Sequence, residues 1–305
     1  MTIVAVTPNP AIDLTYRVPA LEPGGTHRVP TASARAGGKG VNVARVLHQQ
    51  GRPVIVVGTA GGESGRQLAA DLERSGIAHA LVPVAADTRR TVAIVDDEGA
   101  ATVLNETGAE PDAEEVRWLH DRVVGLLPGA SCLVGSGSLP PGVSTEFYGS
   151  LVREASGRGI PSVIDASGPA LVMAAAAGAN VLKPNAEELQ TATGEADPIR
   201  GGEALLALGA GLVLVSLGAD GMLALSARGD RWRARLPEPL RGNPTGAGDA
   251  AVAAVAAAIT EGAEEVPALL IRASAWSAAA VLMPLAGEIS PVGAELEHRL
   301  IVERM

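Results

Sequence analysis

The clearest chemical signal in the chain is a glycine-rich segment, GNPTGAGD at residues 242–249, followed by small residues at 250–259 that predict a helix. Glycines just before a helix let backbone N–H groups converge on an anion, and the positive end of the helix dipole favours negative charge there. Asp249 would lie beside such an anion, where its carboxylate could act as general base for a hydroxyl that attacks a phosphoryl group. An aspartate in the first helical turn is equally typical of an N-terminal cap, so the sequence leaves both roles open.

The same glycines match a second pattern, the dinucleotide-binding fingerprint G-x-G-x-x-A, over residues 246–251. That fingerprint should directly follow a strand in the first βα unit, whereas this copy follows a proline-rich stretch in the last quarter of the chain. A nucleotide-dependent oxidoreductase is therefore only a third hypothesis. A P-loop is excluded, because neither Lys39 nor Lys183 is followed by serine or threonine.

A second glycine-rich stretch, AGGKGVN at residues 36–42, also leads into a predicted helix. Its glycines permit close approach of the backbone to a ligand, and Asn42 in the first turn could bond hydroxyl groups, although such a run is also typical of a plain turn. Lys39 in this stretch and Lys183 are the only lysines among 24 basic residues. Each is therefore a candidate for a role that needs a compact point charge.

Further polar residues follow predicted strands, at the edge where α/β proteins bind ligands. Asp13 comes shortly after the first strand, and it could equally be a solvated loop acid. Asn185 and Glu188 are three residues apart, so they share a helical face suited to oxygen contacts with hydrated Mg²⁺, or they cap that helix. The segments at 136–142 and 216–221 also end strands and contain glycines that could lie against a ligand.

Apolar runs that alternate with helical patterns predict the elements that would position these residues. Such alternation implies βαβ units and a mostly parallel sheet that is covered by helices on both faces. We predict helices at 41–50 and 64–75. We predict strands at 2–7, 54–57, 80–84, 132–135, 162–165, 180–183 and 212–216.

Two segments break this alternation and predict a separate small β-layer. Runs at 91–95 and 101–105 flank the turn Asp96-Asp97-Glu98-Gly99 and predict a β-hairpin. Strand-like pieces at 14–18 and 27–29 surround a proline and glycine turn at 23–25. We therefore expect one domain, residues 1–305, with a discontinuous β-lid at about 12–36 and 88–107.

Composition excludes several classes of protein. The 305 residues are 47% hydrophobic and 19% charged, which favours a large core over disorder. The net charge of −10 argues against binding to nucleic acid or to an anionic membrane. Cys132 is the only cysteine, which excludes a disulfide scaffold and a multi-cysteine zinc site. No signal-peptide pattern opens the sequence and no apolar run could span a bilayer, so we expect a soluble, cytoplasmic protein.

Taken in order, these motifs resemble the ribokinase-like (phosphofructokinase-B type) sugar kinase family over nearly the whole chain. The two signatures of that family resemble GGKGVNVA from Gly37 and PTGAGDA up to Ala250. The segments TPNPAID, SGSLPPGV, VIDASG, LKPNAEEL and VSLGADG resemble its phosphosugar branch, which contains 1-phosphofructokinase, tagatose-6-phosphate kinase and the minor 6-phosphofructokinase. The resemblance implies a three-layer α/β/α fold with a mostly parallel central sheet and a small β-sheet lid.

The resemblance also implies a role for each motif. Asp249 would be the catalytic base, beside an anion hole formed by the backbone of Gly246, Ala247 and Gly248. Arg89 would bind the phosphate that the substrate already carries, unless Arg90 takes that role or Arg89 is a solvated hairpin residue. The sugar would be held by Asp13, Gly38, Lys39, Gly40, Asn42 and Ser138. ATP would lie along Lys183, Asn185, Ser216, Leu217, Gly218, Ala219, Asp220, Gly221, Gly246 and Gly248, with Glu188 organising Mg²⁺ through water.

The activity that the resemblance implies is ATP-dependent phosphorylation of a phosphorylated ketohexose, first of all fructose 1-phosphate to fructose 1,6-bisphosphate. Tagatose 6-phosphate or fructose 6-phosphate is the alternative acceptor, and a sugar-phosphate sensor with weak or lost catalysis is the alternative from another class. The implied partners are the phosphosugar and ATP, without nucleic acid or membrane. The resemblance also implies a homodimer that pairs through the lid.

Two positions depart from the pattern of the family. Asn243 and Pro244 stand where the family commonly has Asp-Thr or Ser-Thr, and Pro244 removes a backbone donor and a hydroxyl. This change puts in question a monovalent-cation site at that place. Thr91 stands where the phosphosugar branch often has asparagine, so one polar contact to the sugar differs.

Overall fold

A large β-sheet forms the centre of the computed structural model, which describes residues 2–97 and 101–305. Its strands are β1 Thr2–Thr7, β4 Val54–Ala60, β5 Ala78–Pro83, β8 Ala130–Ser136, β9 Ser162–Asp165, β10 Val181–Leu182, β11 Leu212–Ser216, β12 Met222–Ser226, β13 Arg231–Arg235 and β14 Ile301–Arg304. Their order across the sheet is β14-β13-β12-β11-β10-β9-β8-β1-β4-β5. Pairing is parallel from β5 to β11 and antiparallel from β11 to β14. The predicted mostly parallel sheet is thus confirmed, with an antiparallel edge that the sequence did not indicate.

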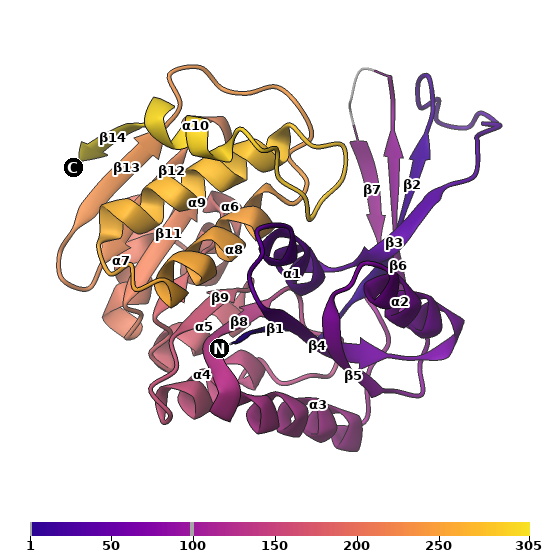
Figure 1. The fold of residues 1–305 in the computed structure, drawn as a ribbon, viewed down its shortest axis with the longest axis horizontal. Helices are drawn as coiled ribbons and strands as arrows, with labels where there is room; N and C mark the ends of the chain where they lie inside the picture. Colours follow the sequence, from indigo (N-terminus) through magenta and orange to yellow (C-terminus); the bar gives the residue numbers. More distant parts are fainter. Residues whose placement is uncertain (1, 98–100) are drawn as a thin grey trace.

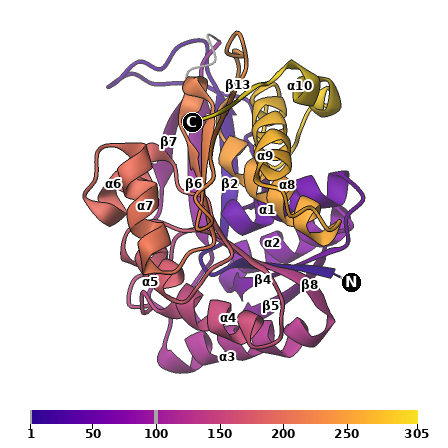
Figure 2. The same cartoon turned by 90° about the vertical axis from the view of Figure 1, so that its left-hand side faces the viewer.

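Helices cover both faces of this sheet, as Figure 2 shows with the sheet seen nearly edge-on. One layer comprises α1 Lys39–Gln49, α2 Gly62–Arg74, α8 Ala247–Thr260, α9 Val266–Val281 and α10 Gly293–Arg299. The other layer comprises α3 Ala113–Leu126, α4 Phe147–Ser156, α5 Pro169–Ala176, α6 Ala186–Thr193 and α7 Pro198–Leu208. Within the described residues, no helix is both long and apolar enough to cross a membrane.

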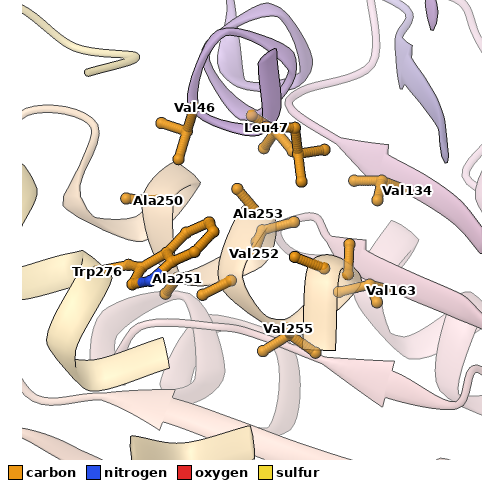
Figure 3. Close-up of a cluster of buried hydrophobic side chains, with 14 of the residues drawn as sticks. Val46, Leu47, Val134, Val163, Ala250, Ala251, Val252, Ala253, Val255 and Trp276 are labelled. Carbon is orange, nitrogen blue, oxygen red and sulfur yellow. The ribbon is translucent and has the colours of Figure 1, made fainter. Parts of the chain in front are cut away.

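Alternation along the strands divides the core between the two helical layers. In β1, Ile3 and Ala5 pack in one apolar cluster while Val4 and Val6 pack in the other, because successive strand side chains point to opposite faces. The small residues of α8 lie at the centre of the first cluster, between α1, α9 and the sheet (Figure 3). This close packing holds the first turn of α8, and with it Asp249, in a fixed place.

A smaller sheet projects from one end of the molecule (Figure 1). It consists of β2 Ala11–Arg17, β3 Ser33–Gly37, β6 Arg89–Val95 and β7 Ala101–Asn105, in the order β3-β2-β6-β7. All four strands fall at the two segments expected for the small β-layer. The prediction of a strand at 27–29 is wrong, because these residues form no strand. Pro30 directly follows that run, and proline cannot donate to a ladder, so the partner of β2 is instead the segment that leads into α1. Glu98 and Gly99 of the predicted hairpin turn lie outside the described residues.

Candidate active site

A cavity of about 1250 Å³ opens between the large and small sheets. The chain segments that follow β1, β8, β9, β10 and β11 line it, because the carboxyl ends of parallel strands meet at one edge. Most of the residues predicted from the sequence meet here. They are Asp13, Gly38, Lys39, Asn42, Arg89, Ser138, Lys183, Asn185, Glu188, Ser216, Gly218, Ala219, Gly221, Gly246, Ala247, Gly248 and Asp249.

Three predicted site residues, Gly40, Leu217 and Asp220, lie outside the cavity lining. A Cβ atom on Gly40 would lie 2.8 Å from the Cβ atom of Thr7, so this glycine lets α1 pack closely on β1. Leu217 packs against the apolar core on the α3–α7 side of the sheet. The backbone carbonyl of Asp220 accepts a hydrogen bond from Arg233 Nη2 at 3.1 Å. Gly40, Leu217 and Asp220 therefore contact other parts of the fold rather than the cavity.

Asp249 lies in the first turn of α8 but does not cap the helix. The N-cap is Gly246, whose φ of 85° is a left-handed conformation that glycine adopts readily. The Asp249 carboxylate is buried, and its Oδ2 accepts a hydrogen bond of 2.8 Å from Asn42 Nδ2. The N-cap interpretation of Asp249 is therefore wrong, and Asn42 fixes the orientation of a carboxylate at the wall of the cavity.

The surroundings of Asp249 raise the pKa of its carboxyl well above the ordinary value. Burial, together with the negative charge of Asp165, raises the pKa of the Asp249 carboxyl to about 7, against the lowering effects of Lys39, Asn42 and Lys183. A carboxylate is a weak base at its ordinary pKa near 4, and its basicity grows as the pKa approaches the operating pH. The environment of Asp249 thus supports the general-base role that the sequence left open.

The two lysines of the chain meet at one buried carboxylate, that of Asp165. Lys39 Nζ lies 3.3 Å and Lys183 Nζ 3.6 Å from Asp165 Oδ1. Burial alone would raise the pKa of Asp165, but the two ammonium groups outweigh it and hold that pKa below its ordinary value. Both lysines of the chain thus place a compact positive charge at the same carboxylate.

Sequence reasoning did not name Asp165 as a site residue. The available signal was its position at the carboxyl end of β9, comparable to that of Ser216 at the end of β11. Its Oδ2 is buried and has no hydrogen-bond partner among the residues that the structure describes. Asp165 therefore presents an unsatisfied oxygen at the cavity as well as holding both lysines.

Asn185 and Glu188 form a capping box at the start of α6. Asn185 Oδ1 accepts a hydrogen bond of 2.8 Å from the Glu188 N–H, and Glu188 Oε2 accepts one of 3.0 Å from the Asn185 N–H. The N-cap interpretation of this pair is therefore confirmed. The second carboxylate oxygen, Oε1, lies 2.9 Å from Lys39 Nζ, so the capping box also fixes Glu188 within the cavity.

Asp13 and Arg89 form the end of the cavity at the small sheet. Asp13 lies within β2 rather than in a loop, and a Cβ atom on Gly37 of β3 would lie only 2.0 Å from its Oδ2. Glycine at position 37 thus makes room for this carboxylate. Burial raises the pKa of Asp13, while the charge of Arg89 opposes that shift.

The guanidinium of Arg89 is fixed by backbone oxygens. Its Nε donates to the Asn9 carbonyl at 3.1 Å and its Nη1 to the Glu106 carbonyl at 3.0 Å. Arg90 is exposed and lies outside the cavity lining, since neighbouring residues of a strand point to opposite faces. Between the two arginines that the sequence offered, the structure places Arg89 at the cavity.

The remaining wall is less polar and was not predicted. It comes from α9 and from the segment between β13 and α8, and comprises Leu236, Pro239, Leu240, Ser274, Ser277, Ala278 and Val281. Apolar walls with a few hydroxyl groups suit a flat heterocyclic ring. Nothing in the local spacing of these residues distinguishes them from ordinary core positions, so the sequence could not reveal this wall.

Comparisons with known proteins agree with this geometry. The pfkB family carbohydrate kinase model matches residues 3–292. Phosphofructokinase-2 from Escherichia coli, solved in complex with potassium, is 28% identical, with 97% of this chain and 98% of that chain covered and a TM-score of 0.89. A structure of the same enzyme in complex with fructose-6-phosphate is 29% identical over 96% and 98% of the two chains, with a TM-score of 0.85.

Two more distant structures show the fold alone. A possible 1-phosphofructokinase from Thermotoga maritima is 24% identical over the full length of both chains, with a TM-score of 0.90. Ribokinase from Arabidopsis thaliana, complexed with ribose and ATP, is 20% identical over 97% and 98% of the two chains, with a TM-score of 0.72. The fold is therefore ribokinase-like, and the chain belongs to the pfkB family of carbohydrate kinases, which are phosphotransferases with an alcohol group as acceptor.

Proposed function

We propose that this protein transfers the terminal phosphoryl group of Mg·ATP to a phosphorylated ketohexose, first of all converting fructose 1-phosphate to fructose 1,6-bisphosphate. One observation carries the proposal: a single cavity joins the buried base Asp249 to the fixed guanidinium of Arg89. Its volume of about 1250 Å³ is enough for two ligands of ordinary size. The less polar wall by α9 suits the adenine ring, which puts the phosphates near Lys183 and the start of α8.

In this mechanism Asp249 Oδ removes the proton from the acceptor hydroxyl as that oxygen attacks the phosphoryl group. Asn42 holds the carboxylate in the required orientation. The N–H groups of Gly246 and Gly248 and the α8 dipole stabilise the charge on the transferring group, whereas the Ala247 N–H donates to the Pro244 carbonyl at 3.2 Å. Gly248 leaves room for this arrangement, because a Cβ atom there would lie 3.2 Å from Lys183 Nζ.

The donor set fits a Mg²⁺ ion that arrives with the nucleotide. Among the described residues no cluster of three metal-ligating side chains is present. Mg²⁺ is commonly held by substrate phosphates and water, with one or two protein carboxylates, and Glu188 and Asp165 are the carboxylates at this part of the cavity. When bound, the ion would neutralise charge on the ATP phosphates.

Arg89 is proposed to hold the phosphate of the acceptor sugar. Arg89→Ala should raise the KM for fructose 1-phosphate about ten- to a hundredfold. This is the change in affinity expected when hydrogen bonds to a charged group are lost. The KM for unphosphorylated fructose should change by less than about twofold, because this sugar has no phosphate that Arg89 could bind. Arg90→Ala is the matched control and should leave both constants unchanged. Equal effects of Arg89→Ala on both sugars would contradict the assignment.

The pKa of Asp249 predicts the acid side of the pH profile. With a pKa of about 7, kcat/KM should fall about tenfold for each pH unit below that value, because a protonated carboxyl accepts no proton. Asn42→Ala removes a hydrogen bond that lowers this pKa, so the limb should move to higher pH. Substrate phosphates titrate near pH 6 in the same way with both enzymes. If the acid sides of the two kcat/KM profiles superimpose, the group that titrates there is not Asp249.

A panel of acceptors tests the choice of substrate. ADP release would be measured with fructose 1-phosphate, fructose 6-phosphate, tagatose 6-phosphate, fructose and ribose. Preference for fructose 1-phosphate supports the proposal. Preference for a 6-phosphate, which the fructose-6-phosphate complex of the 29% identical relative favours, would keep the mechanism and change the acceptor. Turnover of free sugars alone would overturn the role of Arg89, and no turnover would favour a sensor.

The small sheet is proposed to act as a lid and as a dimer contact. Its Asp13, Arg89 and Thr91 face the cavity, where closure would exclude water from the transferring phosphoryl group. All residues of β7 are exposed, including Val103 and Leu104, and an exposed apolar edge strand readily pairs with another chain. Sedimentation velocity tests the pairing: a mass of two chains supports it, and a mass of one chain contradicts it.

A further inference from the structure

Asn243 ties the loop before α8 to the segment after α9. Its backbone N–H donates to the Val281 carbonyl at 2.9 Å, and its side-chain Nδ2 donates to the Pro284 carbonyl at 3.1 Å. Its Oδ1 accepts a hydrogen bond of 3.0 Å from the Thr245 N–H. The orientation of the amide is fixed by these partners, because a carbonyl can only accept and a backbone N–H can only donate.

The segment after α9 contacts both halves of the proposed catalytic centre. A Cβ atom on Gly246, the N-cap of α8, would lie 2.8 Å from the Ala286 Cβ. A Cβ atom on Gly287 would lie 3.2 Å from Oδ1 of Asn42, the residue that holds Asp249. The position of this segment therefore sets both the anion-binding turn and the partner of the base, and Asn243 is one of the groups that fix that position.

The residues at this tie do not fit a monovalent cation such as potassium, the ion with which the related phosphofructokinase-2 was solved. A cation needs oxygen ligands, whereas Asn243 presents amide hydrogens to the Pro284 oxygen and has its own oxygen bonded to Thr245. Pro244 offers no side-chain oxygen. The Pro284 carbonyl can bind either an N–H donor or a cation. Because Asn243 Nδ2 donates to it, this oxygen is not free to bind a monovalent cation.

We propose that Asn243 is a positioning residue that replaces a monovalent cation with a hydrogen bond, which makes the enzyme independent of such cations. The inference rests on the proposed kinase function for its kinetic part only. Its structural part, which concerns how the loop before α8 is held, can be measured without any substrate.

The experiment compares potassium chloride with tetramethylammonium chloride at equal ionic strength, for wild type and Asn243→Asp. The wild type should show the same Tm and, within about twofold, the same kcat in both salts. In Asn243→Asp, two oxygens face each other unless a cation bridges them, so kcat should fall about tenfold or more in tetramethylammonium. Potassium should restore kcat toward the wild-type value and raise the Tm of this variant alone.

Gln190→Glu is the matched control, because it adds the same charge at an exposed position of α6 and should respond to neither salt. Asn243→Ala, which removes the tie without adding a ligand, should lower kcat equally in both salts. Severalfold activation or a raised Tm of the wild type in potassium would overturn the proposal, as would an Asn243→Asp variant whose kcat and Tm ignore potassium. If no kinase activity is found, the proposed function fails, and the Tm values alone still decide the role of Asn243.

Discussion

Replacing Asp249 with asparagine should lower kcat about 10²- to 10⁴-fold, the usual contribution of a general base, while KM for ATP and sugar changes little. Asparagine keeps the size of the side chain and its contact with Asn42 but cannot take the proton of the acceptor hydroxyl. Steady-state ADP release at pH 8 measures the change. Asp121→Asn on the exposed face of α3 is the control and should behave as wild type. Near-normal turnover of Asp249→Asn would show that another group is the base.

The same substitution should make the protein more stable at pH 8. Burial raises the pKa of Asp249 from 3.8 to about 7, so the folded state binds a proton that the unfolded state releases between these values. The carboxyl therefore stabilises the fold less and less as pH rises from about 4 to about 7, and its charge opposes folding fully above that range. The amide in Asp249→Asn carries no such charge, so the variant should gain a few kcal/mol at pH 8, since each pKa unit is worth about 1.4 kcal/mol.

Urea unfolding at pH 8 and at pH 5 tests this second effect. The stability gain of Asp249→Asn should be largest at pH 8 and smaller at pH 5, where the native carboxyl is mostly protonated. Loss of activity together with a gain of stability is expected when a residue is kept for catalysis at the cost of folding. A loss of stability at pH 8 would mean that the carboxylate holds the fold together.

The second large effect is expected at Asp165. Asp165→Asn should destabilise the protein by about 3–5 kcal/mol, the usual cost of removing one partner of a buried ion pair. Lys183 is 3% exposed at its side chain and would lose the carboxylate with which it forms its ion pair, whereas Lys39 retains Glu188 at 2.9 Å. Urea unfolding at pH 7 gives the free energy of unfolding.

A double variant separates charge from shape at this site. Lys183→Met combined with Asp165→Asn leaves no unpaired charge at that position, so it should recover part of the lost stability. If Asp165→Asn unfolds within about 1 kcal/mol of wild type, or if adding Lys183→Met makes the protein less stable still, the two lysines are not held by Asp165 in the way described.

The sequence predicted the parallel part of the fold because strands buried on both faces are continuous apolar runs with glycine at their ends. The strands predicted at 2–7, 162–165 and 212–216 coincide with β1, β9 and β11. The antiparallel edge was missed for the opposite reason. Strand β13 has the sequence RWRAR and is buried only at Ala234. Because three of its five residues are arginines, it is not an apolar run and the sequence gives no signal for a strand.

Local motifs also predicted most of the site, since glycines before a helix and polar residues after a strand can be recognised within a few consecutive residues. What they could not predict is which side chains meet. Asp165 ends β9, Lys183 follows β10 and Lys39 begins α1, so their contact depends on the pairing of β9 with β10 and on the packing of α1 against the large sheet. The wall from α9 depends likewise on the packing of that helix against α8, β12 and β13.

The most direct test of the central claim is ³¹P NMR of the wild-type enzyme with Mg·ATP and fructose 1-phosphate. ADP and a sugar bisphosphate should appear in equal amounts, because the proposed base Asp249 and the proposed lid would direct the phosphoryl group to the sugar. Release of ADP with inorganic phosphate and no phosphorylated product, from this sugar and from both 6-phosphates, would contradict it.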